Sequence, residues 1–208
     1  MASPPETIQE TPVDESKLWS KPPSNTYVPK HDTDWSKFGP IFPYRRGTKP
    51  TTTNYEPHEQ LDQLGPEELY HELQRRCFSL LPGVTEGDSL ISFPESRALL
   101  LDKEQAVGPP ESIMWSVDST HEFAHIHPFP DSSMHVHLPL ELAAFAIAGG
   151  WAEPHSVVWL GFSPINAVML YSPRDEQDLD LIWSLVQESY NFATGKPQIF
   201  RNEPQPID

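Results

Sequence analysis

His121-Glu-Phe-Ala-His-Ile-His127 and Ser133-Met-His-Val-His-Leu138 are two segments in which apolar and polar residues alternate, separated by Pro128-Phe-Pro-Asp-Ser132. Alternation with a period of two is typical of half-buried β-strands, and a Pro-x-Pro-Asp sequence favours a turn. The two segments are therefore predicted to pair as an antiparallel hairpin.

Successive side chains of a strand point to opposite faces of the sheet, so the histidines of each predicted strand share a face. On the first strand, His121, Phe123, His125 and His127 are expected on one face and Glu122, Ala124 and Ile126 on the other. On the second strand, His135 and His137 lie opposite Met134, Val136 and Leu138. If His127 faces His135, then His125 faces His137, and four imidazoles converge; a shift of one residue would separate them.

Helices and further strands are predicted on both sides of this hairpin. Helices are expected over 66–80, with an apolar face of Leu69, Leu73, Cys77 and Leu80, over 139–148 and over 176–193. Strands are expected over 97–102, 112–117 and 167–172. This order predicts the α+β class, a mainly antiparallel sheet with about three helices packed on it.

The proline content divides the chain of 208 residues, because 10 of the 24 prolines lie in the first 60 positions. Residues 1–20 combine prolines with acidic side chains and are predicted to be a disordered leader. Residues 21–60 add aromatic rings, among them Tyr44 and Tyr55, and are expected to form an extended arm anchored by those rings. A single domain is expected over 61–195, followed by a tail over 196–208.

The charge balance excludes several classes of partner. A net charge of −16 without a basic stripe argues against nucleic acid and against anionic membranes. No apolar run is long enough to span a bilayer, and the N-terminus does not resemble a signal peptide. A single cysteine excludes internal disulfides. These features predict a cytoplasmic protein.

Histidine is the residue type that points to chemistry, since six of the nine histidines fall within residues 121–155. Neighbouring imidazoles can transfer protons near neutral pH. They can also hold zinc or iron, with His125, His127 and His135 as ligands. The glutamate and glycines that accompany His-x-His in cupin-type barrels are missing here, however. A third interpretation is that the rings only hydrogen-bond to the backbone.

Four motifs in sequence order resemble the family labelled "luciferase domain" in bacterial and fungal genomes. They are Glu122-Phe-Ala-His-Ile-His-Pro128, Ser133-Met-His135, Gly150-Trp-Ala-Glu-Pro-His155 and Leu170-Tyr-Ser-Pro-Arg-Asp-Glu176. The similarity spans about residues 61–195. The label is historical, and the resemblance implies neither light emission nor any one activity.

The arm and the resemblance together suggest a fungal protein of secondary metabolism. Redox-neutral cyclases of aromatic polyketide pathways include one of the phenalenone type, which adds a phenol oxygen across a prenyl alkene (hydroalkoxylation). Such a reaction needs an acid, a base and a dry pocket. We therefore expect a cyclase, isomerase or lyase-type enzyme without a cofactor that acts on a prenylated aromatic polyketide. The alternatives are a metal-dependent enzyme and a non-catalytic binding or scaffold protein.

The site residues follow from these expectations. The predicted proton-handling set is His125, His127, His135, His155, Glu153 and Glu122. The predicted substrate-binding set is Trp115, Trp151, Tyr171, Arg174 and His137, with Trp151, Glu153 and His155 on one tight loop. The expected partner is an aromatic small molecule, and a homo-oligomer joined through the arm is a further expectation.

Overall fold

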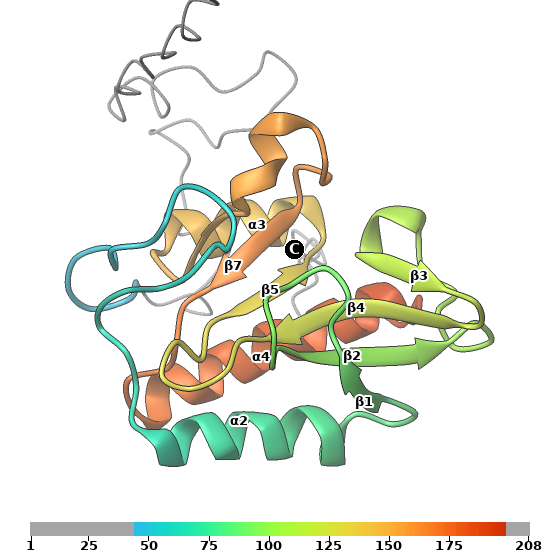
Figure 1. Ribbon diagram of the computed structural model, residues 1–208, viewed down its shortest axis with the longest axis horizontal. Coiled ribbons are helices and arrows are strands. Elements are labelled where there is room, and N and C mark those ends of the chain that lie inside the picture. The colour runs from blue at the N-terminus through green and yellow to red at the C-terminus, as the bar shows by residue number, and fades with distance from the viewer. Residues whose placement is uncertain (1–43, 199–208) are drawn as a thin grey trace, which may run out of the picture.

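The computed structural model describes residues 44–198, and every structural statement below refers to that range (Figure 1). The predicted leader, residues 21–43 of the predicted arm and most of the predicted tail lie outside the described residues.

A seven-stranded sheet organises the described part of the chain. The strand order is β1-β2-β4-β5-β7-β6, β3 pairs with β4 beside this path, and every pair is antiparallel. The strands are β1 Thr85–Asp88, β2 Arg97–Asp102, β3 Trp115–Val117, β4 Thr120–Ile126, β5 Met134–His137, β6 Ala152–Pro154 and β7 Ala167–Leu170.

Three α-helices accompany the sheet in the described range: α2 Glu67–Leu80, α3 Leu140–Ala148 and α4 Glu176–Ala193. Two short 3-10 helices, η2 Pro110–Ser112 and η3 Ser156–Leu160, lie in the connections. In Figure 1, α4 crosses behind β4 and β5, and α2 runs along the lower edge. The α+β class predicted from the sequence is confirmed.

The apolar core lies between the sheet and these helices. Strand residues such as Leu99, Ala124 and Val136 form one buried cluster with Leu73 of α2 and Leu185 of α4. The face of α4 that contains Leu185 is buried, and Asp175 caps the N-terminus of the helix by accepting a hydrogen bond from the Asp178 backbone N–H. On α2, however, Leu80 is half exposed, and Leu81, just after the helix, is buried instead.

Two edge strands differ from the prediction. The first, β1, has the sequence Thr-Glu-Gly-Asp, which carries no apolar alternation. The second, β6, contains Glu153 in the segment that was expected to be a tight loop, and it ends in Pro154. Proline is tolerated on an edge strand because no ladder hydrogen bond is needed on its outer side.

Residues 44–65 cross the domain and are held by polar groups. The rings of Tyr44 and Tyr55 are 69% and 62% exposed, so these two do not anchor the segment as predicted. The buried side chains here are instead polar, such as His58 and Gln60, and Gln60 accepts a hydrogen bond from the Ser172 backbone N–H. None of the helices in the described range is both long and apolar enough to cross a membrane.

Replacing a core leucine tests this assignment of the core. Leu185→Ala removes a fully buried side chain from α4 and should lower the free energy of unfolding by about 2–5 kcal/mol. The matched control Leu160→Ala removes a side chain that is 68% exposed and should change it by less than about 0.5 kcal/mol. Denaturant unfolding followed by circular dichroism measures both, and equal losses would contradict the assignment.

Candidate functional site

A row of side chains crosses the sheet on the face opposite the helices. His125 of β4 lies directly opposite His135 of β5, His135 opposite Met169 of β7, and Met169 opposite Glu153 of β6. Directly paired residues of neighbouring strands point to the same side of a sheet. The ladder therefore brings two histidines and a carboxylate from distant parts of the sequence onto one face.

The hairpin register differs from the predicted one. His125 faces His135, whereas the prediction paired His127 with His135 and His125 with His137. The difference is two residues, so the histidines still share a face. His127, just beyond β4, donates its backbone N–H to Ser133, and its ring centroid lies 4.7 Å from that of His135.

An irregularity in β4 adds Glu122 to this face, contrary to the predicted alternation. The pairing of β2 with β4 passes from Leu99–Ala124 to Leu100–Glu122 and skips Phe123. The extra residue of such a bulge reverses the faces beyond it. Phe123 consequently packs in the helix-side core near Tyr190, and Glu122 Oε1 accepts a hydrogen bond from His125 Nδ1 at 2.7 Å.

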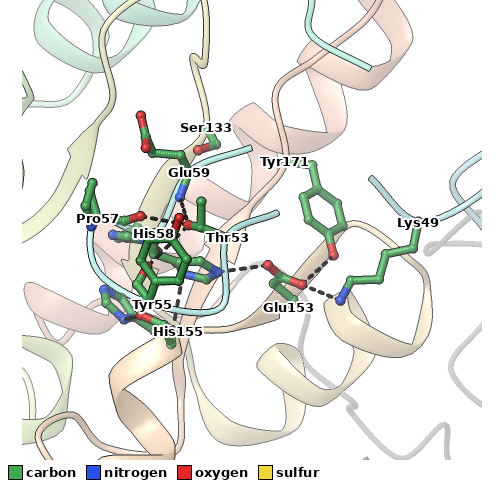
Figure 2. A network of polar contacts seen from close by, with 12 residues as sticks. Lys49, Thr53, Tyr55, Pro57, His58, Glu59, Ser133, Glu153, His155 and Tyr171 are labelled. Atoms are coloured by element: carbon green, nitrogen blue, oxygen red, sulfur yellow. Dashed lines mark hydrogen bonds and ion pairs between the residues drawn. The ribbon is translucent and has the colours of Figure 1, made fainter. Parts of the chain in front are cut away.

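His58, which the sequence did not single out, completes the cluster from the segment 44–65. Thr53 closes its loop: the Thr53 hydroxyl donates to the Pro57 carbonyl and accepts from the Glu59 N–H. His58 Nε2 lies 2.8 Å from Glu153 Oε1, a contact drawn in Figure 2. A single histidine in a proline-rich stretch has no periodicity that marks it, so only its place in the fold reveals it.

Glu153 is the most heavily contacted carboxylate of the site. It pairs with His58 and with Lys49, and Tyr171 donates its hydroxyl to Glu153 Oε2 at 3.3 Å (Figure 2). Burial opposes ionisation of Glu153, but the hydrogen bonds from His58 and Lys49 outweigh it and hold its pKa below the ordinary value. Glu153 is therefore a carboxylate at neutral pH.

His155 approaches from the start of η3. Its ring caps that short helix by accepting the Val157 N–H, and its centroid lies 3.9 Å from that of His135. Together His58, His125, His127, His135 and His155 form what we call the histidine cluster. All five side chains are buried.

Three rings of the histidine cluster, those of His127, His135 and His155, are suited to bind a cation because burial favours their neutral form. Burial lowers the pKa of His135 well below its usual range and that of His155 to about 3. Burial also lowers the pKa of His127, although Asp131 opposes the shift. A neutral imidazole offers a lone pair, which is the form that coordinates a metal.

Two overlapping triads have the geometry of a metal site. His125, His127 and His135 form one, and His58, His135 and His155 form the other; within each, the ligand nitrogens all lie within 4.8 Å of one another. In the first triad, His127 Nε2 is buried without a hydrogen-bond partner. Its Nδ1 lies 2.7 Å from Asp131 Oδ2, so the unpartnered nitrogen carries the lone pair.

The remaining predicted residues fall outside the histidine cluster. His137 shares its face but bonds through Nδ1 to the Glu111 carbonyl. Trp151 packs in the hydrophobic core and Arg174 pairs with Asp178, so neither lies where the expected substrate wall would be. Tyr171 reaches the cluster through Glu153.

Trp115 is half exposed and lines a groove of about 520 Å³ together with His121. The residues that line this groove include none of the histidine cluster. Trp115 and the clustered histidines therefore do not share one pocket.

Comparisons with a family model and with curated proteins both find a similarity to luciferases. Residues 120–189 match the family model described as Luciferase domain. The chain is 25% identical over 171 residues to a luciferase of Armillaria ostoyae and 24% identical over 167 residues to one of Neonothopanus nambi. These alignments cover 76% and 75% of this chain and 63% and 62% of the relatives.

The chain thus spans under two thirds of the length of these relatives. No solved structure matches it. The matched range contains β4, β5, β6 and β7, and four of the five clustered histidines lie on these strands or in the connections between them. Residues 120–189 of this chain are thus similar to the luciferase domain, in agreement with the resemblance of the sequence motifs.

Proposed function

We propose that this protein is an enzyme that acts on a small molecule and whose reaction centre is a divalent metal ion held by His125, His127 and His135. The observation that carries the proposal is the convergence of three buried imidazoles, two of which have their outer nitrogen held by a carboxylate. Glu122 holds His125 Nδ1 and Asp131 holds His127 Nδ1, each at 2.7 Å. Both inner nitrogens are thereby left with lone pairs that point into the cluster.

Carboxylates behind ligand histidines are a recurring feature of metal sites. The carboxylate accepts the second ring N–H, which fixes the tautomer and makes the ligand nitrogen more basic. Here two of the three proposed ligands have such a partner, and both carboxylates are themselves buried. Each carboxylate also accepts a second hydrogen bond, Glu122 from the Ser89 hydroxyl and Asp131 from the Ser133 backbone N–H, so both are held in place behind their rings.

The ligand set restricts the ion. Imidazole suits zinc, iron, copper and nickel, which includes zinc and iron, the two ions of the alternative interpretation of the sequence. Three protein ligands leave coordination positions open, as in catalytic zinc sites. An ion bound there would supply a Lewis acid for a substrate oxygen or a bound water. The residues of this chain would hold it, fix the ring tautomers and exclude bulk water.

The relatives support an enzymatic role only at the level of the family. Their name, luciferase, is a statement about those proteins, and our proposal for this chain does not extend to light emission. An aromatic substrate, as predicted from the sequence, is compatible with the proposal and adds nothing to its support.

A second candidate is the cofactor-independent acid–base cyclisation predicted from the sequence. The observation that favours it is a continuous chain of contacts from Glu122 through His125, His135 and His58 to Glu153. Such a chain can move protons between its two ends. The metal proposal is preferred because burial lowers the pKa of His127, His135 and His155, and rings with a low pKa are good ligands but poor acids for protonating an alkene.

Removing one ligand tests the metal proposal directly. His127→Ala should weaken binding of Zn²⁺ by more than about 100-fold, since the loss of a ligand exceeds the effect of losing an outer partner. His71→Ala is the matched control, because His71 is an exposed histidine of α2. Isothermal titration of the full chain with Zn²⁺ measures both, and equal affinities would contradict the assignment.

Changing the outer carboxylate tests how the ligand is oriented. Asp131→Asn keeps the shape of the side chain but removes its charge, and should weaken Zn²⁺ binding by about 10–100-fold. Circular dichroism confirms that the variant is folded. Unchanged affinity in a folded variant would show that Asp131 only stabilises the connection between β4 and β5 and does not orient a metal ligand.

Metal removal separates the two candidate functions. An ion that binds only the folded state adds about 2.7 kcal/mol of stability at a concentration 100 times its Kd. Chelator-treated protein should therefore melt at a lower temperature than protein with added Zn²⁺, and His127→Ala should reduce this difference. Melting curves that do not respond to chelator or Zn²⁺ favour the acid–base candidate.

A further inference from the structure

His135 is exceptional in the histidine cluster because both of its ring nitrogens face other histidines. Its Nδ1 lies 2.9 Å from His125 Nε2, and its Nε2 lies 3.3 Å from His58 Nδ1. The other rings use one nitrogen for a carboxylate or a backbone group. The ring of His135 thus stands between two separate sets of ligands.

The rings of His125, His135 and His58 have too few N–H groups to place a hydrogen bond at both of their nitrogen–nitrogen contacts. His125 Nδ1 must donate to the Glu122 carboxylate, so His125 Nε2 presents a lone pair to His135. His58 Nε2 must donate to Glu153, and His58 Nδ1 accepts the Ser156 N–H at 3.3 Å, so this nitrogen also presents a lone pair. A neutral His135 has one N–H, which serves one neighbour and leaves two lone pairs facing each other on the opposite side.

A cation between the two facing lone pairs would remove their repulsion. An extra proton would make a buried imidazolium, which desolvation opposes. A metal ion needs lone pairs on every side, and the spacing suits it. Two nitrogens at zinc-bond lengths are about 2.9 Å apart at a right angle and about 3.3 Å apart at a tetrahedral angle. The two nitrogen–nitrogen separations in the structure, 2.9 and 3.3 Å, match these values.

The surroundings on the His58 side form a second triad, in which an ion would take the place of the Ser156 N–H at His58 Nδ1. His58, His135 and His155 are buried, and their ligand nitrogens all lie within 4.8 Å of one another. Glu153 stands behind His58 as Glu122 stands behind His125. Glu56 also lies 3.6 Å from His155 Nδ1, which adds negative charge at the outer edge.

We infer that the histidine cluster binds two divalent metal ions, one on each triad, and that the imidazolate of His135 bridges them. The ring of His135 coordinates one ion through Nδ1 and the other through Nε2, and its remaining N–H proton leaves to solvent. The inference rests on the proposed metal site and adds to it a second ion, a bridging ligand and a role for His58.

Counting ions in ligand variants tests the inference. Full-length protein is equilibrated with Zn²⁺, dialysed and measured by elemental analysis. We expect two ions per chain in the unmodified protein and in the control His71→Ala. His58→Ala and His155→Ala should each retain one ion, held by the other triad. His127→Ala should also retain one, held by His58, His135 and His155.

A magnetic signature identifies the bridge itself. With Cu²⁺ in both sites, an imidazolate bridge should couple the two electron spins. The electron paramagnetic resonance intensity per copper at low temperature should then be much weaker than in His58→Ala or His155→Ala, which hold a single copper. Circular dichroism establishes that each variant is folded, and His155→Ala replaces His58→Ala if the latter does not fold.

The outcomes distinguish the inference from the function on which it rests. One ion in the unmodified protein, lost in His127→Ala and retained in His58→Ala, overturns the second site and leaves the proposed function intact. Two ions with full, uncoupled copper intensity overturn the bridge. No bound ion overturns both proposals.

Discussion

The hydrogen-bonded register between β4 and β5 is the constraint on which the site depends. It sets His125 opposite His135, and the next ladder sets His135 opposite Met169, in line with Glu153. A slip of one residue would turn His135 toward the helices and Val136 toward the site. The apolar residues that alternate with the histidines oppose such a slip, because it would turn them away from the core that packs against α4.

The two faces of the sheet differ in composition and in role. The helix face follows the ordinary hydrophobic pattern and supplies stability. The opposite face buries five imidazoles with Glu122, Asp131 and Glu153, and polar groups cost free energy when they leave water. Each carboxylate is paired with a ring, which recovers part of that cost. A buried layer of polar contacts that lowers the stability of the fold is typical of a functional site.

The segment 44–65 shows how tertiary contacts complete the cluster. His58 and Lys49 come from this stretch and both reach Glu153, which lies roughly a hundred residues further along the chain. The segment is held by hydrogen bonds and ion pairs and not by its aromatic rings. Polar anchoring of this kind leaves no apolar pattern in the sequence, so the aromatic content of the arm pointed to Tyr44 and Tyr55, which are exposed.

Periodicity and turn chemistry in the sequence by themselves determined the α+β class, the bounds of β2 and α4, and a hairpin with its histidines on one face. These features are local: each depends on residues a few positions apart. Only the tertiary structure decided the two-residue difference in register, the bulge that turns Glu122 toward His125, the burial of Trp151 in the core and the arrival of His58. All four arise from the packing of distant strands and segments against one another, which no local pattern records.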